Sequence, residues 1–446
     1  LGIRAAVLLA QRLHAAGRPA EAMALQQALA GLPEGALPAL SLRVDLLGVG
    51  ALDDLIAAAA GADVPRREMA LRLGQALPGQ AVTAAWCAAL PRMEPPAARA
   101  ALVAMLGRRQ DRAALPVLRQ MLADADAGVR AAAMKAFVHG APDVAMTPLV
   151  DIVATGSAED VAAGRALLTW AGGAELPSAA AAALGKATPA GKAALLELLA
   201  SRQASEQAPA VLALLGDGEA SVRLAVLKTL ETLGSADEVP AVLEFTLATQ
   251  AAAERRAAQR ALTAICRRQP AAAAPVVAAL KAASGEARVG LLGLAATLGG
   301  AEALAVVVAD TASPDEAVRL AAVKALGEWP DDAAAAPLIG LARGTADPRT
   351  RVLALRGYVR AVTLPTRRPA AETAALLGQA WALAATADER RLVLSGLGTV
   401  RDDAALASIV KGLDLEDVRE EAAAAVVAVC CPRTDKDPGL LSPAAY

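Results

Sequence analysis

The 446-residue chain is poor in the side chains on which most active sites depend. It has two histidines, His14 and His139, and only 2% of its residues are aromatic. A histidine-based catalytic triad or a two-histidine metal site is therefore not predicted. The scarcity of aromatic rings also counts against a protein that stacks nucleic-acid bases.

Neither sign of charge is in excess, and no long apolar run is free of charge. The formal net charge of -2 gives no global attraction to nucleic acid or to an anionic membrane. No charge-free run of about 18 apolar residues is present, so we predict no membrane span. The sequence indicates neither a cofactor, a metal, a small-molecule site nor a cell compartment. The cysteines lack the spacing of metal ligands and are predicted to be small apolar thiols, and they are Cys87, Cys266, Cys430 and Cys431.

Alanine is abundant, and it recurs in a fixed pattern. The stretch Asp126-Ala-Gly-Val-Arg130-Ala-Ala-Ala-Met134-Lys-Ala-Phe137 has close variants at 219–230 and 315–326. A step of about 30 to 33 residues between equivalent positions is the signature of stacked repeats. The positions equivalent to Arg130 are Arg99, Ala162, Lys192, Arg223, Arg256, Arg288, Arg319 and Arg351.

Each repeat is predicted to be two helices joined by a short turn. Apolar residues such as Val129, Ala133 and Phe137 fall at helical spacing and predict one buried stripe. An acid or hydroxyl residue before the stripe suits an N-cap, and glycine after it suits a left-handed C-cap. Since one pair of helices cannot bury its own stripe, neighbouring pairs must stack. We therefore predict an all-α superhelix, a solenoid of about 13 helical hairpins that follow a leading half repeat.

This pattern resembles the HEAT repeat, in particular the bacterial sort also called lyase HEAT-like repeats. The resemblance rests on a proline-containing first helix, an aspartate turn and a second helix written Val-Arg-x-Ala-Ala-x-x-Ala-Leu-Gly. It covers nearly the whole chain and implies a HEAT/armadillo-like solenoid. It further implies that the second helices face the concave surface and that Asp and Arg residues form stacked ladders. It does not imply one function, because such arrays serve many partners.

The array is predicted to be one continuous solenoid with three stretches and a tail. Degenerate repeats occupy 1–110, regular repeats 111–329 and divergent repeats 330–431, while 432–446 is predicted to be a tail or linker. The last stretch resembles the HEAT region of large bacterial multidomain proteins. Because the chain opens on half a repeat, we expect it to be part of a longer protein.

Two groups of basic residues are candidate contacts. The first lies five residues after the signature cation, on the side expected to be exposed and concave, where cations suit an acidic partner. It consists of Lys135, Lys228, Lys324 and Arg356, with Tyr358 nearby. An ordinary solvated face is the alternative, since the row is interrupted at Leu167, Glu197, Ala261 and Gly293.

The second group lies at the C-terminal ends of second helices and consists of Arg108, Arg109, Arg202, Arg267 and Arg268. Compensation of the helix dipole explains each arginine singly, and a phosphate-binding edge is the alternative.

Aromatic and acidic residues complete the predictions. Trp170 and Phe137 fall on the stripe and are predicted to be core, whereas Tyr358 and Trp329 are predicted to be surface contacts. The recurring acids are predicted to cap helices and to bond the signature arginines, and they are Asp124, Asp126, Asp217, Asp315, Asp347 and Asp388.

Three functions follow from these features. The first is a non-enzymatic scaffold that binds a protein or peptide along its concave face. The second is a nucleic-acid-binding solenoid, against which the near-neutral charge counts. The third is a lyase-like or enzyme-associated module, which would require a reactive thiol at Cys87 or Cys266.

Overall fold

The computed structural model describes residues 2–432 together with 439 and 440. Throughout these residues every regular element is an α-helix or a short 3-10 helix, and none is a β-strand. The all-α prediction is therefore confirmed. The predicted tail at 432–446 lies mostly outside the described residues.

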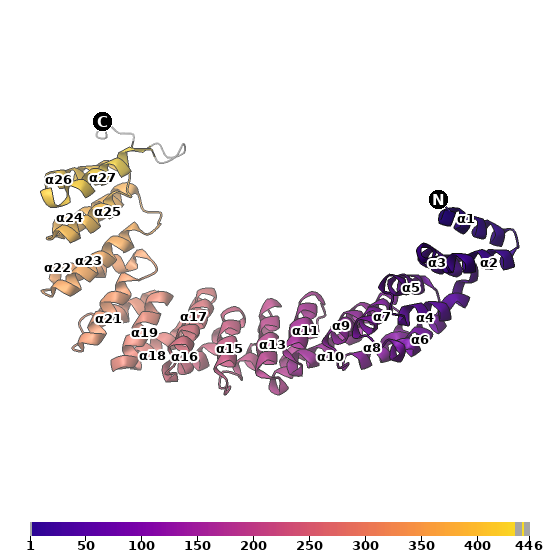
Figure 1. Cartoon of the computed structure of the whole chain (residues 1–446). Helices are drawn as coiled ribbons and strands as arrows, with labels where there is room; N and C mark the ends of the chain where they lie inside the picture. The colour runs from indigo at the N-terminus through magenta and orange to yellow at the C-terminus, as the bar shows by residue number, and fades with distance from the viewer. Residues whose placement is uncertain (1, 433–438, 441–446) are drawn as a thin grey trace. The chain divides into compact units, whose positions relative to one another are not determined.

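The helices form two compact units, residues 1–233 and 234–446, and each unit has two layers (Figure 1). One layer of unit 1 holds the second helices α1 (Gly2–Ala15), α3 (Ala36–Leu47), α5 (Val64–Ala76), α7 (Pro96–Arg109), α9 (Ala127–Gly140), α11 (Ala158–Trp170), α13 (Pro189–Ser201) and α15 (Ala220–Leu233). The other layer holds the first helices α2 (Pro19–Ala30), α4 (Leu52–Ala60), α6 (Gln80–Ala89), α8 (Leu115–Met121), α10 (Pro142–Thr155), α12 (Leu176–Ala183) and α14 (Ala208–Leu212).

Unit 2 repeats this plan. Its first helices are α16 (Val239–Ala248), α18 (Ala274–Ala282), α20 (Ala301–Asp310), α22 (Ala335–Gly344), α24 (Ala370–Leu383) and α26 (Asp403–Leu413). Its second helices are α17 (Ala252–Arg268), α19 (Gly285–Leu298), α21 (Glu316–Gly327), α23 (Pro348–Thr363), α25 (Ala387–Leu397) and α27 (Arg419–Cys430). The described residues thus form 13 hairpins after the unpaired α1, as predicted.

Local sequence explains where these helices begin. Several first helices follow a 3-10 turn and carry proline in their first turn, where no amide donor is needed, and these prolines are Pro116, Pro209, Pro240 and Pro275. Seven of the second helices begin after a side-chain cap, as where the Asp126 carboxylate accepts from the Val129 amide at 3.0 Å. In each unit successive second helices pack on one another, on the inner side of that unit's bend (Figure 1).

Small residues set the distance between second helices. A Cβ atom added to Gly107 on α7 would lie 2.5 Å from the Ala136 Cα atom on α9. Between the two layers, a Cβ atom on Gly74 of α5 would lie 2.3 Å from the buried Trp86 ring on the first helix α6. Such contacts explain why an alanine-rich sequence with few aromatic residues still packs a continuous core.

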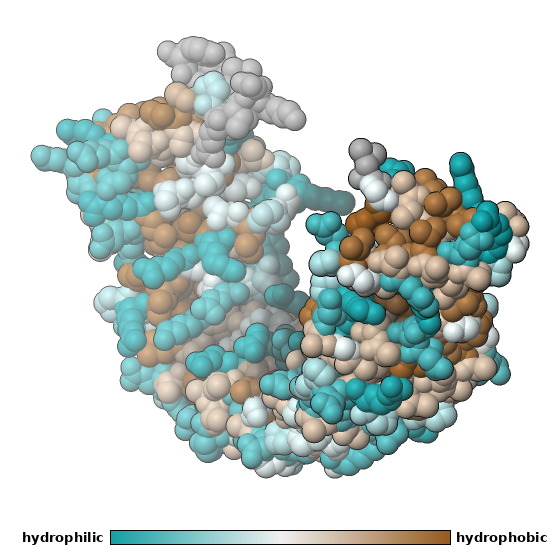
Figure 2. All heavy atoms as spheres, turned by 45° about the vertical axis from the view of Figure 1, so that its right-hand side comes forward, coloured by the Kyte–Doolittle hydropathy of each residue, from teal (hydrophilic) through white to brown (hydrophobic). Residues whose placement is uncertain are grey.

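One stretch, Pro33–Ala60, is apolar and long enough to cross a membrane by length and composition alone. It consists of two helices, α3 and α4, with a break at Gly48, where φ is +55°. Arg43 and Asp54 within it form an ion pair. Figure 2 shows apolar residues gathered on the N-terminal helices of unit 1, where Leu8 and Leu9 of α1 are about half exposed.

Candidate protein-binding surface

The signature cation of a second helix bonds both its own loop and the next repeat. On α9, Arg130 Nη1 donates to the Asp124 and Ala125 carbonyls at 2.9 and 3.0 Å, and Nε donates to Asp160 at 2.8 Å. Burial acts to raise the pKa of Asp160, but the bonds from Arg130 and Ser157 outweigh it and hold that pKa below its ordinary value. The same link joins Arg99 to Asp124, Lys192 to Asp217, Arg288 to Asp310, Arg351 to Glu389 and Arg390 to Asp417.

Two helices are shifted by one residue from the predicted register. In α17, Arg255 rather than Arg256 donates to a loop carbonyl, that of Thr249, at 2.7 Å. In α11, Ser157 is the cap, so Val161 rather than Ala162 takes the signature position. The loops before these helices differ in length, which the helical pattern does not reveal. The position five residues on is therefore Arg260 rather than Ala261, and Ala166 rather than Leu167.

The C-terminal arginines also form structural bonds. Arg109 Nη1 donates to the carbonyls of Gly74 and Leu77, both at 2.7 Å, at the end of α5. Arg202 does the same at the end of α11, and Arg268 Nη2 donates to the Gly234 carbonyl at 2.7 Å. These guanidinium groups satisfy helix-end carbonyls that have no intrahelical partner. Three arginines of this group, Arg108, Arg267 and Arg268, are exposed, and Arg108 Nε donates to Gln75 Oε1 at 2.9 Å.

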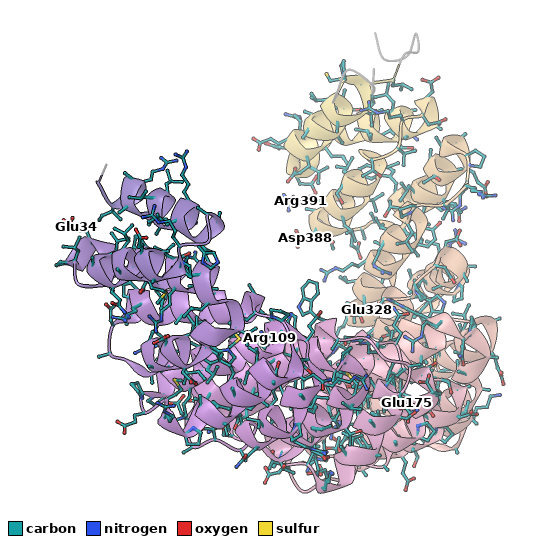
Figure 3. All side chains as sticks on the ribbon, turned by 90° about the vertical axis from the view of Figure 1, so that its right-hand side faces the viewer. Glu34, Arg109, Glu175, Glu328, Asp388 and Arg391 are labelled. Atoms are coloured by element: carbon teal, nitrogen blue, oxygen red, sulfur yellow. The ribbon has the colours of Figure 1, made fainter. Side chains whose placement is uncertain are left out.

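Five of the recurring acids lie in the turn before a second helix, and the sixth, Asp388, lies within the first turn of α25. Asp315 and Asp347 each accept from two amides of the helix that follows them, and Asp217 accepts from the Glu219 amide at 2.9 Å. The exception is Asp388, because Thr386 caps α25 in a reciprocal pair with Glu389. Asp388 is exposed and accepts from Arg391 at 3.0 Å; both are labelled in Figure 3.

Two aromatic residues predicted to be surface contacts are buried. Tyr358 and Trp329 are each 1% exposed. The Tyr358 hydroxyl donates to the Leu376 carbonyl at 2.9 Å, and burial raises the pKa of this phenol. Tyr358 belongs to the core because it faces α24 rather than the open side of α23. The prediction placed both residues by their position in the sequence, which does not determine the direction of a side chain.

The cations of the predicted row are exposed on the second helices. Lys135 lies on α9, Lys228 on α15, Lys324 on α21 and Arg356 on α23. Each follows its signature arginine by five residues, so each occupies the same place on its helix. On α5 the signature cation is Arg67, whose Nη2 atom donates to the Gly61 carbonyl at 2.8 Å. Arg72 follows it by five residues and so occupies the same place on its helix as Lys135 does on α9.

A groove runs over α5, α7 and α9 in unit 1. Its part between α7 and α9 has a volume of about 410 Å³, and its part between α5 and α7 has a volume of about 420 Å³. The two parts adjoin along α7, since Ala104 and Arg108 of that helix line both. We call this feature the α5–α9 groove. Its lining includes Arg72, Ala104, Arg108, Ala132, Lys135 and His139.

Trp170 is 90% exposed, so its prediction as a core residue is wrong. With Ser157 as the cap of α11, Trp170 lies 13 residues after that cap, as His139 lies 13 residues after Asp126. Both positions face solvent. Arg202 holds the backbone on either side of the indole, since its Nη2 atom donates to the Thr169 and Ala171 carbonyls at 3.2 and 2.8 Å.

A second groove of the same kind lies between α25 and α27 in unit 2, with a volume of about 340 Å³. We call it the α25–α27 groove. Arg391 and Glu421 lie at its rim, and Arg391 Nε donates to Glu421 at 2.7 Å. Its rim charges therefore pair with each other.

No cluster of metal-ligating side chains occurs within the described residues. Burial raises the pKa of the Cys87 thiol, with a further rise from Asp111, and burial also raises the pKa of Cys266. A raised pKa favours the protonated thiol, which counts against the reactive thiolate that the enzyme alternative requires.

The comparisons with known proteins agree with this architecture. A family model of HEAT repeats matches residues 83–168. No curated protein has a sequence that matches this chain. The structure of the karyopherin Kap121p bound to the SUMO protease Ulp1p is 12% identical, with a TM-score of 0.51 over 96% of this chain and 53% of that chain. Kap121p bound to the extreme C-terminus of the protein phosphatase Cdc14p is also 12% identical, with a TM-score of 0.51 over 89% and 53%.

The chain spans about half the length of the Kap121p chain it matches. At 12% identity the likeness concerns the fold alone. The chain contains HEAT repeats at residues 83–168 and has the fold of a HEAT-like α-solenoid.

Proposed function

We propose that the chain is a non-enzymatic scaffold that holds a protein or peptide partner along the second-helix faces of its units. One observation carries the proposal: the recurring signature cations bond neighbouring repeats, whereas the cations five residues on remain exposed. A surface with many small contacts over a large area suits a protein partner. Kap121p, which shares this fold, is bound to a protein in both structures described above.

Site-specific crosslinking tests this proposal. A photoreactive amino acid replaces Lys135, Lys228 or Lys324 on the second helices and, as matched controls, the exposed Arg119 or Glu244 on first helices. We expect a protein to crosslink from the second-helix positions only, and the purified partner to bind the intact chain in calorimetry. Equal crosslinking from both layers contradicts the proposal. Crosslinks to nucleic acid favour the nucleic-acid alternative instead.

A further inference from the structure

The α5–α9 groove has a floor of small side chains. Ala104 on α7 and Ala132 on α9 end at Cβ, and the close approach of Gly107 to Ala136 keeps the two helices in contact beneath them. A floor of this kind offers apolar surface and leaves room above it. It therefore fits apolar side chains supplied by another chain, because burying them there removes apolar area from water.

The rim of the α5–α9 groove is cationic. Arg72, Arg108 and Lys135 line it, and Glu68 is the one acid among its lining residues. Arg72 donates to the Met69 sulfur and Arg108 to the Gln75 amide oxygen, so neither charge is neutralised. Within the part of the chain that the structure describes, none of the three cations has an ion-pair partner. This local excess of positive charge contrasts with the net charge of -2 of the whole chain.

Trp170 extends the same surface to α11. It occupies the register position of Arg108 on α7 and His139 on α9, on the next second helix of the stack. Because the indole is 90% exposed, a partner can cover it without displacing packing contacts of the folded chain. Tryptophan is also among the residues that most often dominate binding energy. Because Arg202 holds its backbone, little main-chain freedom remains to be lost on binding.

We infer that the α5–α9 groove binds an acidic amphipathic segment of a partner protein. Its apolar side chains lie on the alanine floor and against Trp170, and its carboxylates meet Arg72, Arg108 and Lys135. The inference rests on the proposed scaffold function and adds the chemistry of the partner. The apolar floor favours such a segment over a nucleic acid, whose phosphates would meet the rim but leave the floor uncovered.

A designed peptide pair tests the inference on the full chain. The probe is a fluorescein-labelled peptide of about four helical turns, with leucine on one face and glutamate on the other. Its twin carries lysine in place of each glutamate. We expect the glutamate peptide to bind in fluorescence anisotropy, to shift the emission of Trp170, and to bind less tightly as salt is raised. The lysine twin should not bind.

Matched variants locate the binding. The pair Arg108→Glu and Lys135→Glu should weaken binding by at least about tenfold, and Trp170→Ala should abolish the emission shift. The control Arg391→Glu makes one such charge reversal in the α25–α27 groove and should leave binding unaltered, whereas either Arg108→Glu or Lys135→Glu alone should weaken it. Circular dichroism confirms that each variant is folded.

Equal binding of both peptides, or equal loss in the Arg391→Glu control, overturns the inference. If the peptides fail but crosslinking at Lys228 or Lys324 yields a protein partner, the scaffold function stands and this groove is not its acidic-segment site. If the glutamate peptide binds through Arg108 and Lys135 and the second-helix positions crosslink to a protein, both the inference and the scaffold function stand. If those positions crosslink to nucleic acid only, the inference is overturned together with the scaffold function.

Discussion

The α5–α9 groove and the α25–α27 groove both lie between second helices that pack glycine against alanine, but their rims carry different charges. The α5–α9 groove crosses the α7–α9 pair, where Gly107 faces Ala136, and the α25–α27 groove lies where Gly398 faces Ala425. The position of Lys135 on α9 is Ala424 on α27. The first rim carries unpaired cations, whereas the second carries the Arg391–Glu421 pair. Because the helices beneath are alike, the comparison assigns the choice of partner to a few rim side chains rather than to the fold.

The two grooves also differ in how firmly their helices are held. A Cβ atom on Gly107 would meet Ala136 at 2.5 Å, whereas one on Gly398 would meet Ala425 at 3.4 Å. The cation of α9, Arg130, pairs with the buried Asp160, while that of α25, Arg390, pairs with the exposed Asp417. We therefore expect the α7–α9–α11 stack to be more sensitive to substitution than the α25–α27 pair.

The ion pairs that join neighbouring repeats should show the largest difference between the two regions. Arg130→Ala leaves Asp160 buried without its charged donor, so we expect a loss of about 2–3 kcal/mol in the local free energy of opening. Arg390→Ala removes a solvent-exposed pair and should cost less than about 1 kcal/mol. Amide exchange in α9 and α11, compared with α25 and α27, measures both effects. Equal losses would contradict the difference in burial.

A glycine pair comes next. Gly107→Ala forces α7 and α9 apart and should destabilise the chain by about 1–3 kcal/mol. Gly398→Ala places its methyl group in ordinary contact with Ala425 and, at a φ of -63° that alanine adopts, reduces the freedom of the unfolded chain. We therefore expect a change within about 1 kcal/mol that favours stability. Denaturant midpoints of the two variants give the comparison. If Gly107→Ala leaves the denaturant midpoint unchanged, α7 and α9 are packed less tightly than the distance between Gly107 and Ala136 implies.

Acid should weaken the first region through its buried carboxylate. The pKa of Asp160 is lower in the folded chain than the value of about 3.9 expected when unfolded. The folded state therefore binds fewer protons, and the stabilisation is complete above the unfolded pKa and lost as pH falls through the folded value. Amide exchange in α9 and α11 should rise below about pH 4, and this pH dependence should be smaller in Arg130→Ala. An unchanged pH dependence would exclude Asp160 as its source.

The repeat and its caps could be predicted from the sequence because they follow local rules. The stripe of Val129, Ala133 and Phe137 and the cap at Asp126 recur with a near-constant step, and the structure confirms 13 hairpins and a leading half repeat. The signature cations outside α11 and α17 could be predicted for the same reason, and the α5–α9 groove rim includes two predicted candidates, Arg108 and Lys135.

Side-chain direction near irregular loops could not be predicted. A shift of one residue at Ser157 was enough to move Trp170 from the predicted core to the surface. Tyr358 and Trp329 were predicted at the surface but are buried, because neighbouring elements cover them and the sequence does not specify how those elements approach. The groove itself was missed, since its floor is alanine and alanine occurs everywhere in this chain. A signal was present in the cations Arg72, Arg108 and Lys135, none of which forms an ion pair within the described residues.

Giving the α25–α27 groove the rim charges of the α5–α9 groove tests directly what distinguishes the two. This variant has the smallest expected effect. Glu421→Ala with Ala424→Lys removes the acid that neutralises Arg391 and supplies the counterpart of Lys135. The α25–α27 groove should then bind the glutamate peptide weakly, and we expect a gain of about tenfold over the unaltered groove. This gain is measured in a chain that also carries Arg108→Glu and Lys135→Glu. No tryptophan is among the described residues that line this groove, so the affinity should stay below that of the α5–α9 groove. If the transplanted cations bring no binding, rim charge alone does not select the partner, and the floor and Trp170 must contribute the larger part.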